Sequence, residues 1–170
     1  MEYDMKEFIM GILKAKELAQ YISEYYKEHT GKDISPVRLQ KTLYFCFAYW
    51  GGFILKGKRY QGETTEIDVS KYSEYLFSED IEAWVYGPVV KEVYHEKNLL
   101  KYHNNNLFDG DDFLQDFINN IIDDTLELND FRLVDISHCD KSWKDNFDYE
   151  EVFHNNVIPP ESIIEEYAKK

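Results

Sequence analysis

Histidine and cysteine are the side chains of this sequence best suited to bind a metal ion, but their spacing argues against a metal site. The five histidines are His29, His95, His103, His138 and His154. None of them forms an HExxH or CxxC pattern with a partner at ligand spacing. The acidic run at 109–112 lacks the alternating ligands and the bidentate glutamate of a calcium-binding loop, and helix capping is its favoured role. We therefore predict no bound metal and no other cofactor.

Catalytic patterns are equally weak. The sequence has no GxSxG motif, and the neighbouring pair Ser137–His138 does not define a triad, because a triad is a spatial arrangement. Gly51–Gly52 is not a GxxxxGK phosphate-binding loop. Carboxylates are so numerous that any two of them could meet in a cleft, so their presence has almost no specificity. We predict that the protein is not an enzyme, and we keep a hydrolase with an unrecognised carboxylate site as a less favoured alternative.

Two helices are predicted in the first third of the chain. Apolar residues recur at helical spacing over residues 14–29, and a glycine follows. Ser35 can cap the second helix and Pro36 can occupy its first position, and the pattern continues to about residue 55. From residue 43 onward both faces of this helix are apolar, which is typical of a central helix packed on several sides. Buried positions are expected for Leu43, Phe47 and Trp50. Gly51–Gly52 either permit close packing of this helix or end it.

The later elements are shorter. Residues 81–86 favour a strand, and Pro88 can open a helix that includes Val89, Val93 and Tyr94. A helix capped by Asp111 or Asp112 is predicted to about residue 126. Residues 130–138 are expected as a helix or an extended piece, the stretch around Trp143 as a loop, and the end of the chain as a short helix after Pro159–Pro160.

Composition limits the class of protein. The chain has 170 residues, of which 44% are hydrophobic, which is enough for one compact domain with a core. The excess of 33 acidic over 19 basic residues gives a formal charge of −14. This charge opposes direct binding to nucleic acid or to an anionic membrane, and it favours a basic partner or simply solubility. The longest apolar run, 43–55, is shorter than the ~20 residues that span a bilayer. Only Cys46 and Cys139 are present, which fits a reducing compartment and a cytoplasmic location.

Three separated segments together resemble the Panacea domain of SocA-like antitoxins. The first is RLQKTLYFCFAYW at 38–50, the second is LFSEDIEAWVYGPVVKEVY at 76–94, and the third is LVDISHCDKSW at 133–143. Their order matches the family, and with the intervening helices they cover most of the chain. Ser142 departs from the pattern, because relatives often carry proline before the tryptophan. The first thirteen residues lie outside the resemblance.

The resemblance implies a mainly α fold, with a single compact helical domain over residues 14–170 and a small β element around the EAWVYGPV segment. Residues 1–13 would be an N-terminal arm or a short helix. The family occurs in bacteria and phages, and its members resemble antitoxins that neutralise the toxin encoded beside them by direct protein contact. The SocA branch resembles a proteolytic adaptor that delivers its toxin to a host protease such as ClpXP. No catalytic residues are implied.

Seven residues of the second and third segments are candidates for partner binding: Trp84, Tyr86, Gly87, Pro88, Tyr94, His138 and Trp143. For the tryptophan, glycine and proline at 84, 87 and 88 we favour a role in holding the fold, because they suit a core anchor, an unusual backbone shape and a fixed φ. The two tyrosines suit the edge of a groove. His138 and Trp143 fit an interface anchor and a cover over the core equally well.

The leading hypothesis is therefore an antitoxin that sequesters its cognate toxin. The runner-up is a phage or prophage accessory protein of the same fold that binds a different host protein. A toxin gene next to this one would separate the two hypotheses.

Overall fold

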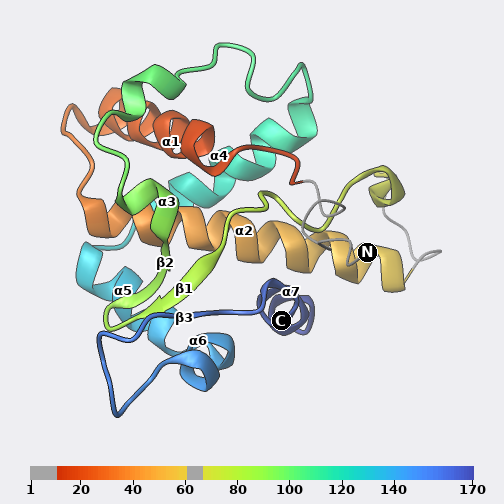
Figure 1. The fold of residues 1–170 in the computed structure, drawn as a ribbon. Helices are drawn as coiled ribbons and strands as arrows, with labels where there is room; N and C mark the ends of the chain where they lie inside the picture. Colours follow the sequence, from red (N-terminus) through yellow and green to blue (C-terminus); the bar gives the residue numbers. More distant parts are fainter. Residues whose placement is uncertain (1–10, 61–66) are drawn as a thin grey trace, which may run out of the picture.

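The structure is a computed structural model, and it describes residues 11–60 and 67–170 (Figure 1). It is mainly α-helical, with one small antiparallel sheet, as the sequence predicts. Figure 1 shows the long helix α2 running through the middle of the molecule, with α1 and α4 on one side and with the sheet, α6 and α7 on the other. The helices are α1 (Ala15–Thr30), α2 (Pro36–Arg59), α3 (Lys91–Tyr94), α4 (Asp112–Leu126), α5 (Asp130–His138), α6 (Lys141–Asn146) and α7 (Pro160–Ala168).

Helix α2 begins as its sequence predicts. The Ser35 side chain accepts a hydrogen bond from the Arg38 backbone N–H at 3.1 Å, and Pro36 occupies the first turn. The helix then buries nearly all of its faces against α1, α4, α5, α7 and the sheet. Burial of Leu43, Phe47 and Trp50 is confirmed, since none of them exposes more than 1% of its surface.

Gly51 and Gly52 let α2 and α7 pack closely. Of the two roles expected for this pair, close packing is therefore correct and ending the helix is not. A Cβ on Gly51 would lie 2.6 Å from Ile164 Cγ1, and one on Gly52 would lie 2.6 Å from the backbone carbon of Tyr167. Because both clashes involve the packed body of α7, the pair serves as the contact surface for that helix, and α2 continues past it to Arg59.

The sheet has the strand order β2-β1-β3. Strand β1 (Ile81–Trp84) pairs antiparallel with β2 (Gly87–Val90), with Ile81 opposite Val90 and Trp84 opposite Gly87. The two-residue strand β3 (Asn156–Val157) lies on the other side of β1. The helix expected to open at Pro88 is therefore wrong over 88–90, because the turn at Gly87 folds this segment back on β1. Only the short helix α3 follows.

The C-terminal half confirms some expectations and corrects one. Asp111 caps α4 by accepting the Leu114 N–H at 3.0 Å, and residues 130–138 form the helix α5. The stretch around Trp143 is not a loop: it is the helix α6, and Trp143 is buried. A helix this short has little apolar periodicity, so its sequence pattern gave no helical signal. After Pro159, the helix α7 turns Ile163, Ile164 and Tyr167 inward as predicted.

The N-terminal arm predicted for residues 1–13 falls mostly outside the described residues. Its last part runs beside the segment before β1, where Ile12 N–H donates to Tyr75 O at 3.1 Å and Leu13 N–H donates to Leu76 O at 2.8 Å. Leu13 is buried in the common core. None of the helices formed by the described residues is long and apolar enough to cross a membrane.

The central position of α2 leads to a matched pair of substitutions. Phe47→Ala should lower the free energy of unfolding by about 3–5 kcal/mol, because it opens a cavity beside Phe77, whose ring centroid is 4.9 Å away. Phe153→Ala removes the same atoms from a side chain that is 86% exposed, and should change stability by no more than about 0.5 kcal/mol. Equal urea midpoints for the two variants would contradict the central-helix assignment.

Candidate functional site: the β1–β2 hairpin and its supports

The second and third motif segments meet at the turn of the β1–β2 hairpin. Trp143 Nε1–H donates a hydrogen bond to Trp84 O at 2.8 Å, and His138 Nε2 lies 3.1 Å from Val85 O. Because a carbonyl oxygen only accepts, His138 carries its proton on Nε2 in this contact. The two rings also contact each other, with centroids 4.3 Å apart. Consecutive carbonyls of the hairpin turn are thus held by side chains from α5 and α6.

Gly87 shows why this turn requires glycine. Its φ is +107°, a backbone shape that side-chain-bearing residues rarely adopt. A Cβ at this position would lie 2.5 Å from Ser137 Oγ and 2.9 Å from Lys41 Cε. Backbone shape and crowding therefore exclude a side chain here for two separate reasons.

The first motif segment holds the other strand of the hairpin from α2. The Gln40 side-chain amide donates to Val90 O at 3.2 Å and accepts the Val90 N–H at 2.8 Å, so it pairs with the free edge of β2 as a neighbouring strand would. Lys41 Nζ donates to Pro88 O at 2.9 Å. The LQK sequence on α2 and the GPV sequence of the hairpin therefore form one unit, joined through the backbone of β2.

Lys41 is an unusual side chain for this position, because only 2% of its surface is exposed. The part of the chain that the structure describes contributes no carboxylate to it, and burial alone lowers the pKa of its ammonium group to about 7. Burial also lowers the pKa of His138, with a smaller contribution from the nearby Lys41 charge. The packing under the hairpin thus disfavours positive charge.

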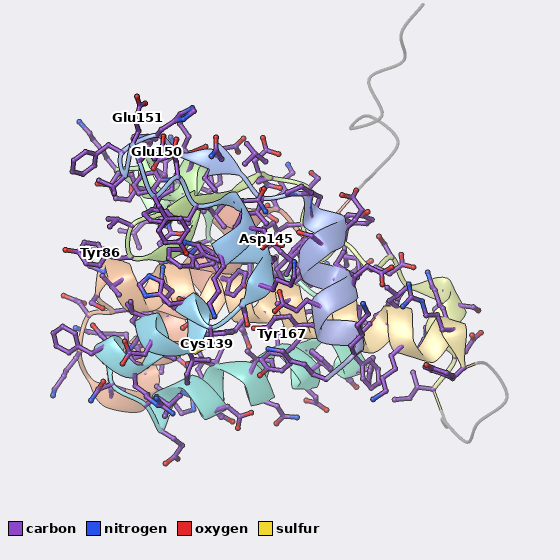
Figure 2. All side chains as sticks on the ribbon, turned by 90° about the horizontal axis from the view of Figure 1, so that it is seen from below. Tyr86, Cys139, Asp145, Glu150, Glu151 and Tyr167 are labelled. Atoms are coloured by element: carbon purple, nitrogen blue, oxygen red, sulfur yellow. The ribbon has the colours of Figure 1, made fainter. Side chains whose placement is uncertain are left out.

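The seven candidate residues fall into two groups. Gly87, Pro88 and Trp143 are buried, and Trp84 and His138 are half-buried, so these five hold the hairpin to the body. Tyr86 and Tyr94 are 68% and 56% exposed. Tyr94 packs against the Trp84 ring at 4.7 Å, and Figure 2 shows Tyr86 at one edge of the molecule. Only the two tyrosines offer a large surface to a partner.

A buried carboxylate beside the third segment was not predicted. Asp140 is only 2% exposed. It accepts hydrogen bonds from the Tyr44 and Tyr167 hydroxyls and forms an ion pair with Lys170 Nζ at 3.2 Å. Burial raises the pKa of Tyr44 and Tyr167, and the Asp140 charge raises both further. The only sequence feature that pointed to a role for Asp140 was its position directly after the SHC sequence of the third segment. With its oxygens occupied, this carboxylate ties α2, α6 and α7 together.

Ser142 stands where relatives often have proline, and the structure gives its role. Its backbone N–H donates to Glu166 Oε1 at 2.9 Å, and the Lys141 N–H donates to Glu166 Oε2 at 2.7 Å. The Glu166 carboxylate on α7 therefore caps the start of α6. Proline at 142 would lack the N–H and lose one of these two bonds.

The chemistry available to these groups is limited. Ser137 is fully buried, and its hydroxyl donates to Val134 O at 2.7 Å, whereas His138 bonds to the hairpin, so the neighbouring pair is not joined. A separate cluster, which sequence reasoning missed, brings ligand atoms of Asp148, Glu151 and His154 within 4.8 Å of one another. Their spacing of three residues was its signal. Asp148 already accepts bonds from this turn's backbone and His154, and the absence of a metal remains a prediction.

Taken together, fold and site define a helical protein whose small hairpin is held by α2, α5 and α6, with one exposed tyrosine in its turn and another at the end of the adjoining helix α3. Residues 65–144 match the family model of SocA-like antitoxins, the Panacea domain. The resemblance is thereby confirmed for the part of the chain that contains the hairpin, α4, α5 and the start of α6, whereas the LQK segment of α2 lies outside the match. The comparisons with curated proteins and with solved structures found no match.

The hairpin turn can be tested with two glycine substitutions. Gly87→Ala should lower the free energy of unfolding by about 3 kcal/mol, because strain and overpacking add. Gly31→Ala also has a positive φ, +73°, but its Cβ would meet nothing within 4 Å, so it should cost only about 1 kcal/mol. A loss at Gly87 no larger than at Gly31 in chemical denaturation would contradict the crowded turn.

The burial of Lys41 predicts a pH dependence of stability. Between pH 7 and 8.5 the unfolded chain keeps a proton on Lys41 that the folded protein releases, because the pKa of this side chain is about 7 in the folded protein and 10.5 when it is exposed to water. The free energy of unfolding should therefore rise with pH, by up to about 1.4 kcal/mol per pH unit. Urea titrations of the wild-type protein and Lys41→Met across this range provide the measurement. Parallel slopes for the two proteins would refute the prediction.

Proposed function

We propose that the protein is an antitoxin that neutralises a cognate toxin by direct protein–protein contact. The observation that carries the proposal is the match of residues 65–144 to SocA-like antitoxins, since this segment includes the hairpin and much of its support. Binding rather than catalysis fits the site, because the polar groups under the hairpin are engaged in holding backbone. In this proposal the protein inhibits the toxin by staying bound to it, one copy for each toxin molecule.

We propose two contact residues: Tyr86 in the turn of the hairpin, and Tyr94 at the end of the adjoining helix α3. Tyrosine suits an interface because its large apolar ring carries a polar tip and loses little conformational entropy. The turn that bears Tyr86 is held by His138 at Val85 O and by Trp143 at Trp84 O, so it is presented in a fixed shape. A fixed shape lowers the ordering cost of binding.

Charge supports a basic toxin. A net charge of −14 speeds the approach of a basic partner and disfavours nucleic acid and anionic membranes as direct ligands. We place the protein in the cytoplasm, where its two unpaired cysteines stay reduced. Delivery of the bound toxin to a host protease such as ClpXP, as in the SocA branch, is compatible with this binding role and is a second step after it.

The test titrates purified protein against a fixed amount of the toxin encoded beside it and measures residual toxin activity. Sequestration should give a sharp endpoint near equimolar ratio. Tyr86→Ala combined with Tyr94→Ala should weaken binding by about 30-fold or more, as expected for interface hot spots. Tyr60→Ala, at a tyrosine of 59% exposure on the far end of α2, is the matched control.

Two outcomes would contradict the proposal. Complete inactivation at about one-hundredth of the equimolar ratio, with no isolable complex, would indicate turnover and an enzyme. A toxin that stays fully active with excess protein would favour the accessory-protein hypothesis. Purified components are necessary, because a recruited protease would imitate turnover in cells.

A further inference from the structure

An apolar groove lies between α2, α4 and α5, on a face of α5 other than the one that holds the hairpin. Its volume is about 250 Å³, enough for one or two large aliphatic side chains. Asp124 stands at its edge. The apolar lining consists of Phe45, Tyr49, Ile121, Leu128, Leu133 and Ile136. Figure 2, which views the molecule from below, shows α4 and α5 side by side on this face.

The apolar surface continues from the groove along α2 and α4. Phe53 is 37% exposed, and its ring lies 5.4 Å from Phe117 and 6.0 Å from Phe113. Tyr49 and Phe53 are one helical turn apart on α2, and the α4 aromatics have the same spacing. The ring centroids of Phe113 and Phe117 are 6.2 Å apart, which is close to the spacing of side chains one turn apart on a third helix.

The segment that forms the α4 and α5 walls of this groove is strongly acidic, whereas the charged residues of α2 are all basic. Residues 111–136 contain eight carboxylates and one basic residue, Arg132, which gives −7 of the total −14. Helix α4 itself has no lysine or arginine. Among the described residues, no lysine or arginine forms an ion pair with Asp116, Asp124 or Asp135, and all three are exposed.

Positive charge lies at both ends of this face and is largely engaged. At one end, the buried Arg38 donates to Thr125 O at 2.7 Å and pairs with Asp130 at 3.0 Å. At the other end, Lys170 pairs with Asp140 at 3.2 Å, and Lys56 Nζ donates to the Lys170 carbonyl at 3.3 Å. Close to this end, Tyr49 contacts the ring of Tyr167 at 4.8 Å. The charged residues of the α4 wall are therefore all acidic. At the α7 end, the positive charge of Lys170 is balanced by the carboxylate of Asp140.

We propose that the α2–α4–α5 groove binds an amphipathic helix of the toxin that carries lysine or arginine beside its apolar face. The identity of the occupant rests on the proposed antitoxin function. Aliphatic side chains at i, i+3, i+4 and i+7 would fill the groove, and the basic residues would lie over Asp116, Asp124 and their neighbours on α4. A second copy of this chain would bring the same −7 and be repelled, and an anionic membrane would be repelled for the same reason.

The direct test uses a peptide, so that it does not depend on the toxin. A fluorescein-labelled peptide of about 18 residues, with leucine at the stated spacing and lysine elsewhere, is titrated with the protein and followed by anisotropy. Binding should be at least about tenfold tighter than that of a scrambled peptide of equal composition, which has the same charge but no apolar face.

A charge-matched pair of double variants locates the site. Asp116→Lys with Asp124→Lys should weaken peptide binding by about tenfold or more. Glu150→Lys with Glu151→Lys changes the net charge by the same amount on an exposed loop, which Figure 2 shows on the other side of the molecule from α4. This control should change the affinity for the peptide less than twofold. Equal losses in both variants, equal binding of the scrambled peptide, or no binding at all would overturn the groove as a site.

The same variants in the toxin titration identify the occupant. If the groove holds the toxin, the Asp116–Asp124 variant should lose neutralisation while the Glu150–Glu151 variant keeps the equimolar endpoint. Full neutralisation by the Asp116–Asp124 variant would overturn the toxin as the occupant, while leaving sequestration itself intact. Failure of the wild-type protein in that titration, with peptide binding retained, would instead refute the proposed function alone.

Discussion

The structure depends on side chains of one central helix that hydrogen-bond to the backbone of other elements. Gln40 occupies both polar groups of Val90, Lys41 takes the carbonyl of Pro88, and Arg38 reaches carbonyls at the end of α4. Backbone groups removed from water must be paired, and an unpaired one costs about 1–3 kcal/mol. A hairpin too small to be stable alone can therefore lie against an apolar helix only because that helix carries these polar side chains at its N-terminal half.

This arrangement separates support from recognition within a single short segment. The turn of the hairpin has its carbonyls bound from α5 and α6, and its glycine is packed so closely that no side chain fits. Tyr86 in the turn and Tyr94 at the end of the adjoining helix α3 remain exposed to solvent. The rigid part of the motif thus determines where the exposed ring of Tyr86 stands.

Charge is distributed as unevenly as polarity. The buried layer under the hairpin disfavours cations, since burial lowers the pKa of both Lys41 and His138, whereas the face formed by α4 and α5 concentrates carboxylates around an apolar groove. Like charges placed this close on neighbouring helices repel one another and reduce stability. Their concentration beside exposed aromatic side chains is the observation on which the proposed basic partner rests.

The sequence by itself determined the mainly α class, the start of α2 at Ser35–Pro36 and the burial of its stripe, because capping and helical periodicity are local signals. It also singled out the hairpin segment. Tertiary structure decided what local signals do not contain. Gly87–Val90 became a strand and not a helix because it pairs with the preceding strand β1 and because Gln40, 50 residues away in the sequence, binds the backbone of Val90. Trp143 became a buried support because the carbonyl of Trp84 lies within its reach. The shared carboxylate of Asp140 and the acidic groove arise only where distant helices pack together, and no spacing along the chain encodes that meeting.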